Sequence, residues 1–167
     1  MIQVEIANEQ SKHACDADLV RQAVQVVLCG ESVDSANVSV AIVDDAAIHL
    51  LNRKYLQHDY ATDVLSFLLS AANEPLEGEI IVSADTAARE AVQYAWGIMD
   101  ELLLYVIHGT LHLVGYDDAS EPERSTMRSK ERAYLAALGR RPNEEAPVAA
   151  SGSVPIVERP SKGEGLS

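Results

Sequence analysis

The sequence is short of cysteine, of long apolar runs and of basic residues, and each shortage excludes a class of protein. Two cysteines in 167 residues are too few for the disulfide framework of a small secreted domain. The longest apolar stretch, residues 102–116, is interrupted by His108 and His112, which argues against a membrane-spanning helix. The first ten residues alternate like a strand and lack the basic start and apolar core of a signal peptide. We therefore expect a cytoplasmic protein without a membrane partner.

The charge balance is acidic, with 13 basic residues against 26 acidic residues and a formal net charge of −13. This balance argues against a DNA-binding protein, because a basic surface usually drives general affinity for nucleic acid. Six basic residues against one acid nevertheless lie between residues 124 and 141. Such a run is either a solvated helix face, which is the more common case, or a local patch that contacts phosphate groups. In the second case Arg128 and Lys130 are the candidate substrate contacts.

Hydrophobic periodicity predicts one α/β domain over residues 1–139. Alternating patterns predict strands, and patterns of period 3.6 between capping residues predict helices. The predicted strands cover residues 2–7, 38–43, 64–69 and 79–83, and the predicted helices cover about 16–28, 44–56, 83–96, 98–114 and 120–138. Apolar residues cover most of the circumference of the fourth helix, so we expect it to be buried at the centre of the domain.

The composition changes after residue 139. Four of the six prolines fall in residues 140–167, together with glycine, serine and alanine. This composition is typical of a disordered tail. Its basic and acidic residues balance, so the predicted domain carries the whole net charge.

Two histidines on the predicted central helix begin a pattern typical of a metal site, H-x-x-x-H-x-x-G-x-x-D. His108 and His112 are four residues apart, so both imidazoles can reach one ion from the same helix face. Gly115 lets the chain leave the helix and turn back, and Asp118 can then present a third ligand. Three protein ligands and an open fourth position are typical of catalytic zinc. Asp117 is the alternative third ligand, and paired histidines without a metal are the alternative to the whole site.

The residue after the first histidine excludes one kind of metalloenzyme. A zinc protease of the H-E-x-x-H type carries its general base at this position, which here is Gly109. The histidine spacing still permits a hydrolase of peptides or other small esters and amides, but the missing glutamate counts against it. Glu101 and Tyr105 share the helix face of the histidines and are candidates to orient an imidazole. The alternative is that both are simply exposed at the helix start.

Four sequence blocks resemble the YbeY family of bacterial metal-dependent endoribonucleases. They are H-G-T-L-H-L-V-G-Y-D at 108–117, L-N-R-K-Y at 51–55, D-Y-A-T-D-V-L-S-F at 59–67 and G-E-I-I-V at 78–82. The resemblance covers about residues 1–139 and implies a mixed four-stranded sheet surrounded by about five to six helices. It also implies one zinc ion per chain and a role in trimming the 3′ end of small-subunit ribosomal RNA and in ribosome quality control.

Two positions depart from the family pattern, which has a third histidine ligand at Asp118 and an arginine at Leu56. Aspartate is an ordinary zinc ligand, but a carboxylate also suits harder ions, so manganese or another divalent metal is an alternative. Leucine cannot clamp a phosphate, and we expect Arg53, one helical turn earlier, to supply the missing charge. Asp63 is a second candidate catalytic residue at the cleft, although a turn carboxylate is the more frequent role for an aspartate before a strand.

The favoured function is cleavage of RNA phosphodiesters by a water activated on a metal at His108, His112 and Asp118. The expected partners are single-stranded ribosomal RNA and the small ribosomal subunit. One alternative is a ribosome-associated binding factor with a weak or vestigial metal site, which the loss of the third histidine and of the arginine suggests. The other alternative is a zinc hydrolase of another substrate class.

Overall fold

The predicted α/β class is confirmed by the structure, a computed structural model that describes residues 1–58, 62–141 and 157–158. Within these residues, strands and helices alternate up to Leu56, two strands follow in succession, and three helices precede a short last strand. The strands are β1 (Ile2–Asn8), β2 (Ala36–Val43), β3 (Val64–Leu68), β4 (Leu76–Ser83) and β5 (Val157–Glu158), and the helices are α1 (Ala17–Gly30), α2 (Asp45–Leu56), α3 (Ala84–Gln93), α4 (Ile98–Leu113) and α5 (Glu121–Ala137).

The strands form one mixed sheet in the order β1-β2-β4-β3-β5. Strands β1, β2 and β4 are parallel, whereas β3 runs antiparallel to β4. The predicted mixed four-stranded sheet is therefore confirmed, and the two-residue strand β5 extends it by pairing with Phe67 and Leu68. Strand β5 falls in the tail that the sequence predicts to be disordered. The rest of that tail, from residue 142 onward, lies outside the described residues.

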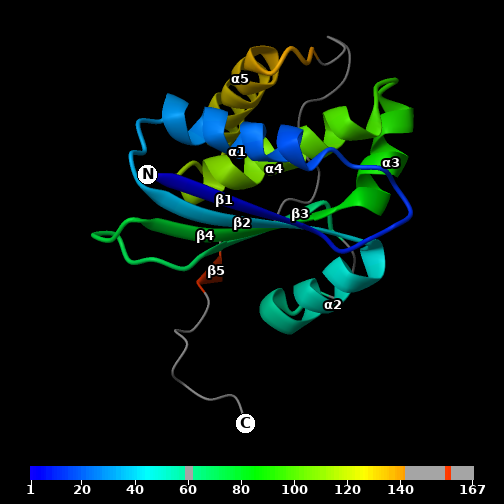
Figure 1. The fold of residues 1–167 in the computed structure, drawn as a ribbon, viewed down its shortest axis with the longest axis horizontal. Helices are drawn as coiled ribbons and strands as arrows, with labels where there is room; N and C mark the ends of the chain where they lie inside the picture. Colours follow the sequence, from blue (N-terminus) through cyan, green and yellow to red (C-terminus); the bar gives the residue numbers. More distant parts are fainter. Residues whose placement is uncertain (59–61, 142–156, 159–167) are drawn as a thin grey trace.

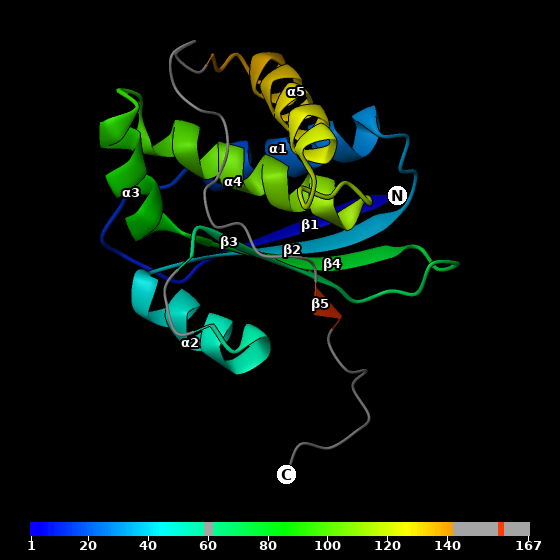
Figure 2. The ribbon, with the colours of Figure 1, turned by 180° about the vertical axis from the view of Figure 1, so that it is seen from behind.

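Helices α1, α3 and α4 lie on one face of the sheet, with α5 packed on α1 and α4, and helix α2 lies on the other face (Figures 1 and 2). Apolar side chains of α1, α3, α4 and α5 form the larger core with sheet residues such as Val40, Ile80 and Val82. Helix α2 packs on the opposite face, against a smaller cluster that includes Phe67 and Ile81. In the described part of the chain, no helix is both long and apolar enough to cross a membrane.

Helix α4 is the central helix, as predicted, and lies between the sheet and helix α5. Every residue from Glu101 to Leu113 is buried. Gly109 allows the close approach to the sheet, because a Cβ atom at this position would lie 2.9 Å from both Ile80 Cγ2 and Ser66 Oγ. The Ser66 hydroxyl donates a hydrogen bond to the Gly109 carbonyl at 3.2 Å. The neighbouring face of the helix, which carries His108, lies against α5.

Several element boundaries differ from those predicted. Strand β4 begins at Leu76, three residues earlier than expected, because its first residues pair with the start of β2. Helix α3 ends at Gln93 and not near residue 96, and Ala95 then adopts a positive φ of 56°. Helix α1 begins after the Asp16 cap as expected and includes Gly30. These differences move no predicted site residue to another element.

We expect Gly109→Ala to destabilise the protein by roughly 1–3 kcal/mol, because the added methyl group would overpack the contact between α4 and the sheet. In an uncrowded helix interior, the same change stabilises by roughly 0.5–1 kcal/mol. Urea unfolding of wild type and variant measures the difference, with Ser129→Ala on the exposed side of α5 as control. A more stable Gly109→Ala variant would contradict the close packing described above.

Candidate metal centre

The three predicted ligands come from the last turns of helix α4 and from the loop that follows it. His108 and His112 are both buried on α4. The helix ends as the Gly115 amide donates to the His112 carbonyl at 3.1 Å and the Tyr116 amide donates to the Leu111 carbonyl at 3.0 Å. Gly115 has a φ of 106°, a conformation that side-chain-bearing residues rarely adopt. This reversal brings Asp118 back beside the histidines.

The ligand atoms converge on one point. His108 Nε2 lies 3.1 Å from His112 Nε2, while the Asp118 carboxylate oxygens lie 3.6 Å from His108 Nε2 and 3.8 Å from His112 Nε2. Two atoms bound tetrahedrally to one zinc at about 2.0–2.2 Å would lie about 3.3–3.6 Å apart. The donor set therefore fits a divalent metal ion in both chemistry and spacing.

The structure also distinguishes between the two aspartates. Only Asp118 joins the histidines in the metal-ligating group found among the described residues. The Asp117 side chain is exposed and accepts a hydrogen bond from the Asp118 backbone amide at 2.7 Å. Asp117 thus shapes the loop, and Asp118 is the aspartate that could supply a ligand atom.

A buried glutamate on α5, which the sequence pattern did not predict, contacts Nδ1 of His108. Glu131 on α5 is 1% exposed, and its Oε1 lies 2.5 Å from His108 Nδ1. Glu101 and Tyr105 are the predicted candidates to orient an imidazole. The prediction is wrong for Glu101, whose carboxylate accepts a hydrogen bond from the Trp96 indole at 2.8 Å. A sequence signal for Glu131 did exist, because it lies midway between two buried α5 residues spaced eight apart, Met127 and Leu135.

The electrostatics of the site follow from burial and from the carboxylates around it. Burial lowers the pKa of His108, but the hydrogen bond and charge of Glu131 outweigh this effect and raise it above the usual value. Burial and the charge of His108 lower the pKa of His112. Burial raises the pKa of Glu131. A protonated His108 can therefore donate the Nδ1 hydrogen to Glu131 and the Nε2 hydrogen to His112.

Comparisons with known proteins agree with this site and fold. The family described as Endoribonuclease YbeY matches residues 5–139. The chain belongs to the YbeY endoribonuclease family. Family membership makes it a hydrolase that acts on RNA. An Endoribonuclease YbeY of Chloroherpeton thalassium is 38% identical over 133 residues, which are 80% of this chain and 94% of that protein.

Two further relatives support the assignment. An Endoribonuclease YbeY of Rhodopirellula baltica is 44% identical over 120 residues, covering 71% of this chain and 62% of that protein. The solution structure of a Thermotoga maritima protein aligns with a TM-score of 0.59 at 27% identity, over 83% of this chain and 89% of that chain. The YbeY resemblance noted in the sequence is thus confirmed.

Among the YbeY-like positions, Asp63 lies beside the metal ligands, directly before β3. Its side chain is 4% exposed and accepts hydrogen bonds from the Val64 amide at 2.8 Å and the Thr62 hydroxyl at 3.3 Å. Burial raises the pKa of its carboxyl to about 6, against the opposing positive charge of His108. The residue thus makes the hydrogen bonds of a turn carboxylate and also faces the site electrostatically.

Arg53, selected as a replacement for the family arginine, is exposed on helix α2. That helix covers the sheet face opposite α4 (Figures 1 and 2). The structure therefore places Arg53 and the metal ligands on elements that pack against opposite faces of the sheet. Its catalytic role stays a prediction.

The two predicted substrate contacts on α5 differ in their surroundings. Lys130 lies 3.2 Å from the Glu31 carboxylate, with its ammonium 5.7 Å from the centre of the Tyr116 ring. Arg128 lies 4.0 Å from Glu121 at the limit of an ion pair, and its side chain is 40% exposed. Lys130 thus links α5 to the end of α1. Arg128 is about as exposed as Lys130, whose side chain is 37% exposed, but its ion pair is longer.

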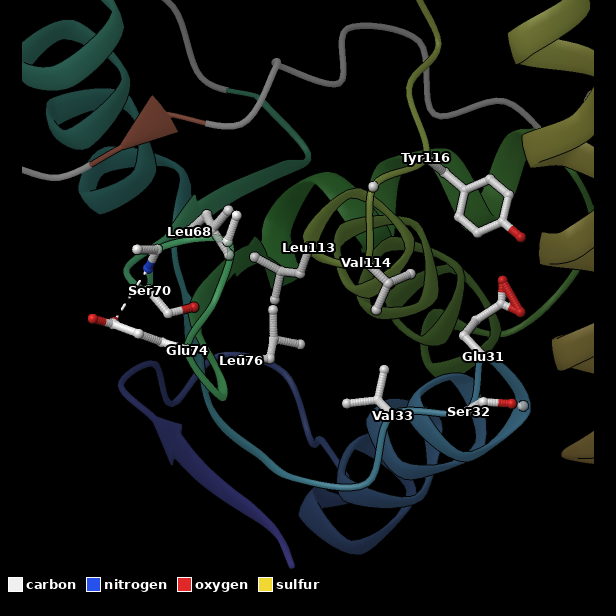
Figure 3. Close-up of a pocket in the computed structure, with 14 residues that line it drawn as sticks. Glu31, Ser32, Val33, Leu68, Ser70, Glu74, Leu76, Leu113, Val114 and Tyr116 are labelled. Atoms are coloured by element: carbon white, nitrogen blue, oxygen red, sulfur yellow. Dashed lines mark hydrogen bonds between the residues drawn. The ribbon is translucent and has the colours of Figure 1, made fainter.

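A pocket of about 810 Å³ opens beside the end of α4 (Figure 3). It is bounded by residues 30–33, by part of the β3–β4 connection and by residues 113–116. The lining includes two carboxylates, Glu31 and Glu74, and none of the three metal ligands. Glu31 is paired with Lys130, and the pocket lies apart from the candidate metal centre because none of the three candidate ligands lines it.

We expect Asp63→Asn to increase the free energy of unfolding relative to wild type, and we expect this increase to grow as the pH rises. The raised pKa means that the folded protein keeps a proton which the unfolded chain releases between about pH 4 and 6. The protonated Asp63 carboxyl therefore stabilises the folded wild type fully below about pH 4, and this stabilisation is lost as the pH rises through about 6. Because one pKa unit corresponds to about 1.4 kcal/mol, the variant should gain on the order of 3 kcal/mol over wild type by pH 7.

Urea unfolding of the metal-free proteins at several pH values measures this gain, and the exposed Asp34→Asn serves as control. A difference between wild type and Asp63→Asn that does not change from pH 4 to 7 would contradict the raised pKa.

Proposed function

We propose that this YbeY-family protein is a cytoplasmic, metal-dependent endoribonuclease that cleaves single-stranded RNA at the 3′ end of small-subunit ribosomal RNA. A role in ribosome quality control at the small subunit is part of the proposal. The convergence of His108, His112 and Asp118 on one point is the observation that carries it. Family membership supplies the RNA substrate.

The chain's own residues would bind the ion and keep the site in shape. When bound, a divalent ion supplies Lewis acidity, which acidifies a coordinated water and offsets charge on a phosphoryl oxygen. His108 and His112 would present their Nε2 atoms and Asp118 a carboxylate oxygen. The burial of the two histidines keeps bulk water away from their rings.

Asp63 is the proposed general base. Its pKa of about 6 allows the carboxylate to accept a proton near neutral pH and to release it again. The electrostatic interaction with His108 supports a position beside the reacting water. The hydrogen bonds from Val64 and Thr62 would hold the carboxylate in place.

We propose zinc as the resident ion, with manganese as the competitor. Two imidazoles favour zinc. The carboxylate of Asp118, in place of the third histidine that the sequence comparison leads us to expect, favours a harder ion. Replacing that carboxylate by an imidazole should therefore shift the preference toward zinc.

A second function, a ribosome-associated binding factor with a vestigial site, is favoured by one observation. The family arginine is replaced by Leu56, and Arg53 lies on a helix that packs on the other face of the sheet. A mutant that has lost its metal but still supports ribosome maturation in cells would favour this function over the nuclease.

We expect wild-type protein to bind about one divalent metal per chain and His112→Ala to bind none, as measured by elemental analysis after reconstitution. Cleavage of single-stranded RNA should fall on the order of 100-fold or more in the variant, because several kcal/mol of charge stabilisation is lost. Asp118→His is the matched variant, and it should bind zinc while losing affinity for manganese.

His49→Ala on the exposed helix α2 is the control, since it removes an imidazole far in sequence from the ligands. Cleavage that survives metal loss in His112→Ala would disprove the proposed mechanism.

RNA binding should depend on Arg128 more than on Lys130. We expect Arg128→Gln to weaken binding and to reduce the slope of log affinity against log salt by about one, because one phosphate contact is lost. Lys130→Gln should mainly reduce stability, since its ammonium is paired with Glu31. Filter binding at several salt concentrations measures both effects.

Arg53→Ala in the RNA cleavage assay tests the arginine replacement, with an expected loss of about tenfold or more in cleavage. Unchanged cleavage in a folded Arg53→Ala variant would remove that role. Equal salt slopes for wild type and Arg128→Gln would remove the phosphate contact on α5.

A further inference from the structure

Helix α5 contacts the proposed metal site at two points, the His108 side chain and the backbone of residues 118 and 119. Glu131 Oε1 lies 2.5 Å from His108 Nδ1. One turn after the start of the helix, Arg124 Nη1 donates hydrogen bonds to the backbone carbonyls of Asp118 at 3.2 Å and Ala119 at 3.3 Å. We propose that α5 holds the metal ligands in place, with Glu131 as the positioning residue for His108 and Arg124 as the positioning residue for Asp118. This inference rests on the metal site of the proposed function.

The contact with Glu131 determines which nitrogen of His108 faces the ion. A neutral imidazole carries its proton on one nitrogen and offers a lone pair on the other. A carboxylate at Nδ1 accepts that proton and leaves Nε2 to act as the ligand. Nε2 is the atom that lies near His112 and Asp118. The hydrogen bond thus selects the one tautomer that can bind a metal at this point.

The burial of Glu131 indicates a function other than helix stability. A carboxylate that is 1% exposed loses its hydration, and its Oε2 has no hydrogen-bond partner among the described residues. An apolar residue would usually stabilise such a position better than a buried ion pair. The neighbours on the same stripe, Met127 and Leu135, are apolar. The carboxylate is therefore best explained by what it does to His108.

Arg124 acts on the loop that presents the third ligand. Its guanidinium is held by Glu121 at 2.9 Å, so the two donated hydrogen bonds start from a fixed group. They fix the backbone at residues 118–119, directly after the turn at Gly115. Because the Asp118 side chain is 25% exposed, backbone contacts are needed to keep its carboxylate near the histidines. Arg124 therefore belongs to the metal site although it contacts no ligand atom.

Metal affinity of the full chain tests the inference. Competition with a chromogenic chelator gives the Kd for Zn²⁺ and Mn²⁺ of wild type, Glu131→Gln and Arg124→Gln. We expect affinity to fall about 10- to 100-fold in Glu131→Gln and about tenfold in Arg124→Gln, the range found for groups that orient metal ligands. Arg124→Lys, which keeps a donor, should recover part of the loss. Glu5→Gln on β1 and Arg132→Gln on α5, both exposed, should bind like wild type.

A measurement on the wild type guards against a variant that fails to fold. Long-range ¹⁵N correlation spectra identify the protonated nitrogen of each histidine, and His108 should carry its proton on Nδ1 in the zinc-loaded protein. A proton on Nε2, or equal metal affinity in wild type and Glu131→Gln, would overturn the role of Glu131. A wild type that binds no divalent metal would overturn the proposed function and this inference together, which is a different result from intact binding in the variants.

Discussion

Burial of two imidazoles on a helix that packs tightly against the sheet is the constraint on which the rest of the site depends. Gly109 brings α4 against β3 and β4, and the neighbouring face of the same helix, which carries His108 and His112, turns toward α5 and the loop after α4. Polar groups buried there must find partners inside the protein. Glu131 and Asp118 are those partners, and they come from the two elements that directly follow α4 in the chain.

The charge around the histidines suits a cation. Asp63, Asp118 and Glu131 place three carboxyl groups near two imidazoles, and burial raises the pKa values of Asp63 and Glu131. Without a metal, protons supply the missing positive charge, as the raised pKa of His108 shows. A divalent ion can replace those protons, which couples metal binding to proton release. Asp118 stands where the family resemblance places a third histidine, and its carboxylate adds to this excess of negative charge.

The basic run on and after α5 has a largely internal use. Arg124 holds the loop carbonyls, Lys130 pairs with Glu31, and Arg140 pairs with Asp100 at 2.9 Å. These three residues make contacts within the protein, and Arg128 remains the candidate for contact with phosphate. With a formal net charge of −13, the protein has little general electrostatic attraction to RNA.

The sequence by itself determined the approximate strands and helices and the group of candidate ligands, because these depend on local periodicity, caps and short spacings. His108, His112 and Asp118 lie within eleven residues, so one helix turn and one glycine are enough to bring them together. Only the tertiary structure showed that Glu131 meets His108 across 23 residues and that Arg124 holds Asp118. It also placed Arg53 on the far face of the sheet. Such contacts depend on how helices cross and on which side of the sheet each one packs, and no local pattern encodes that.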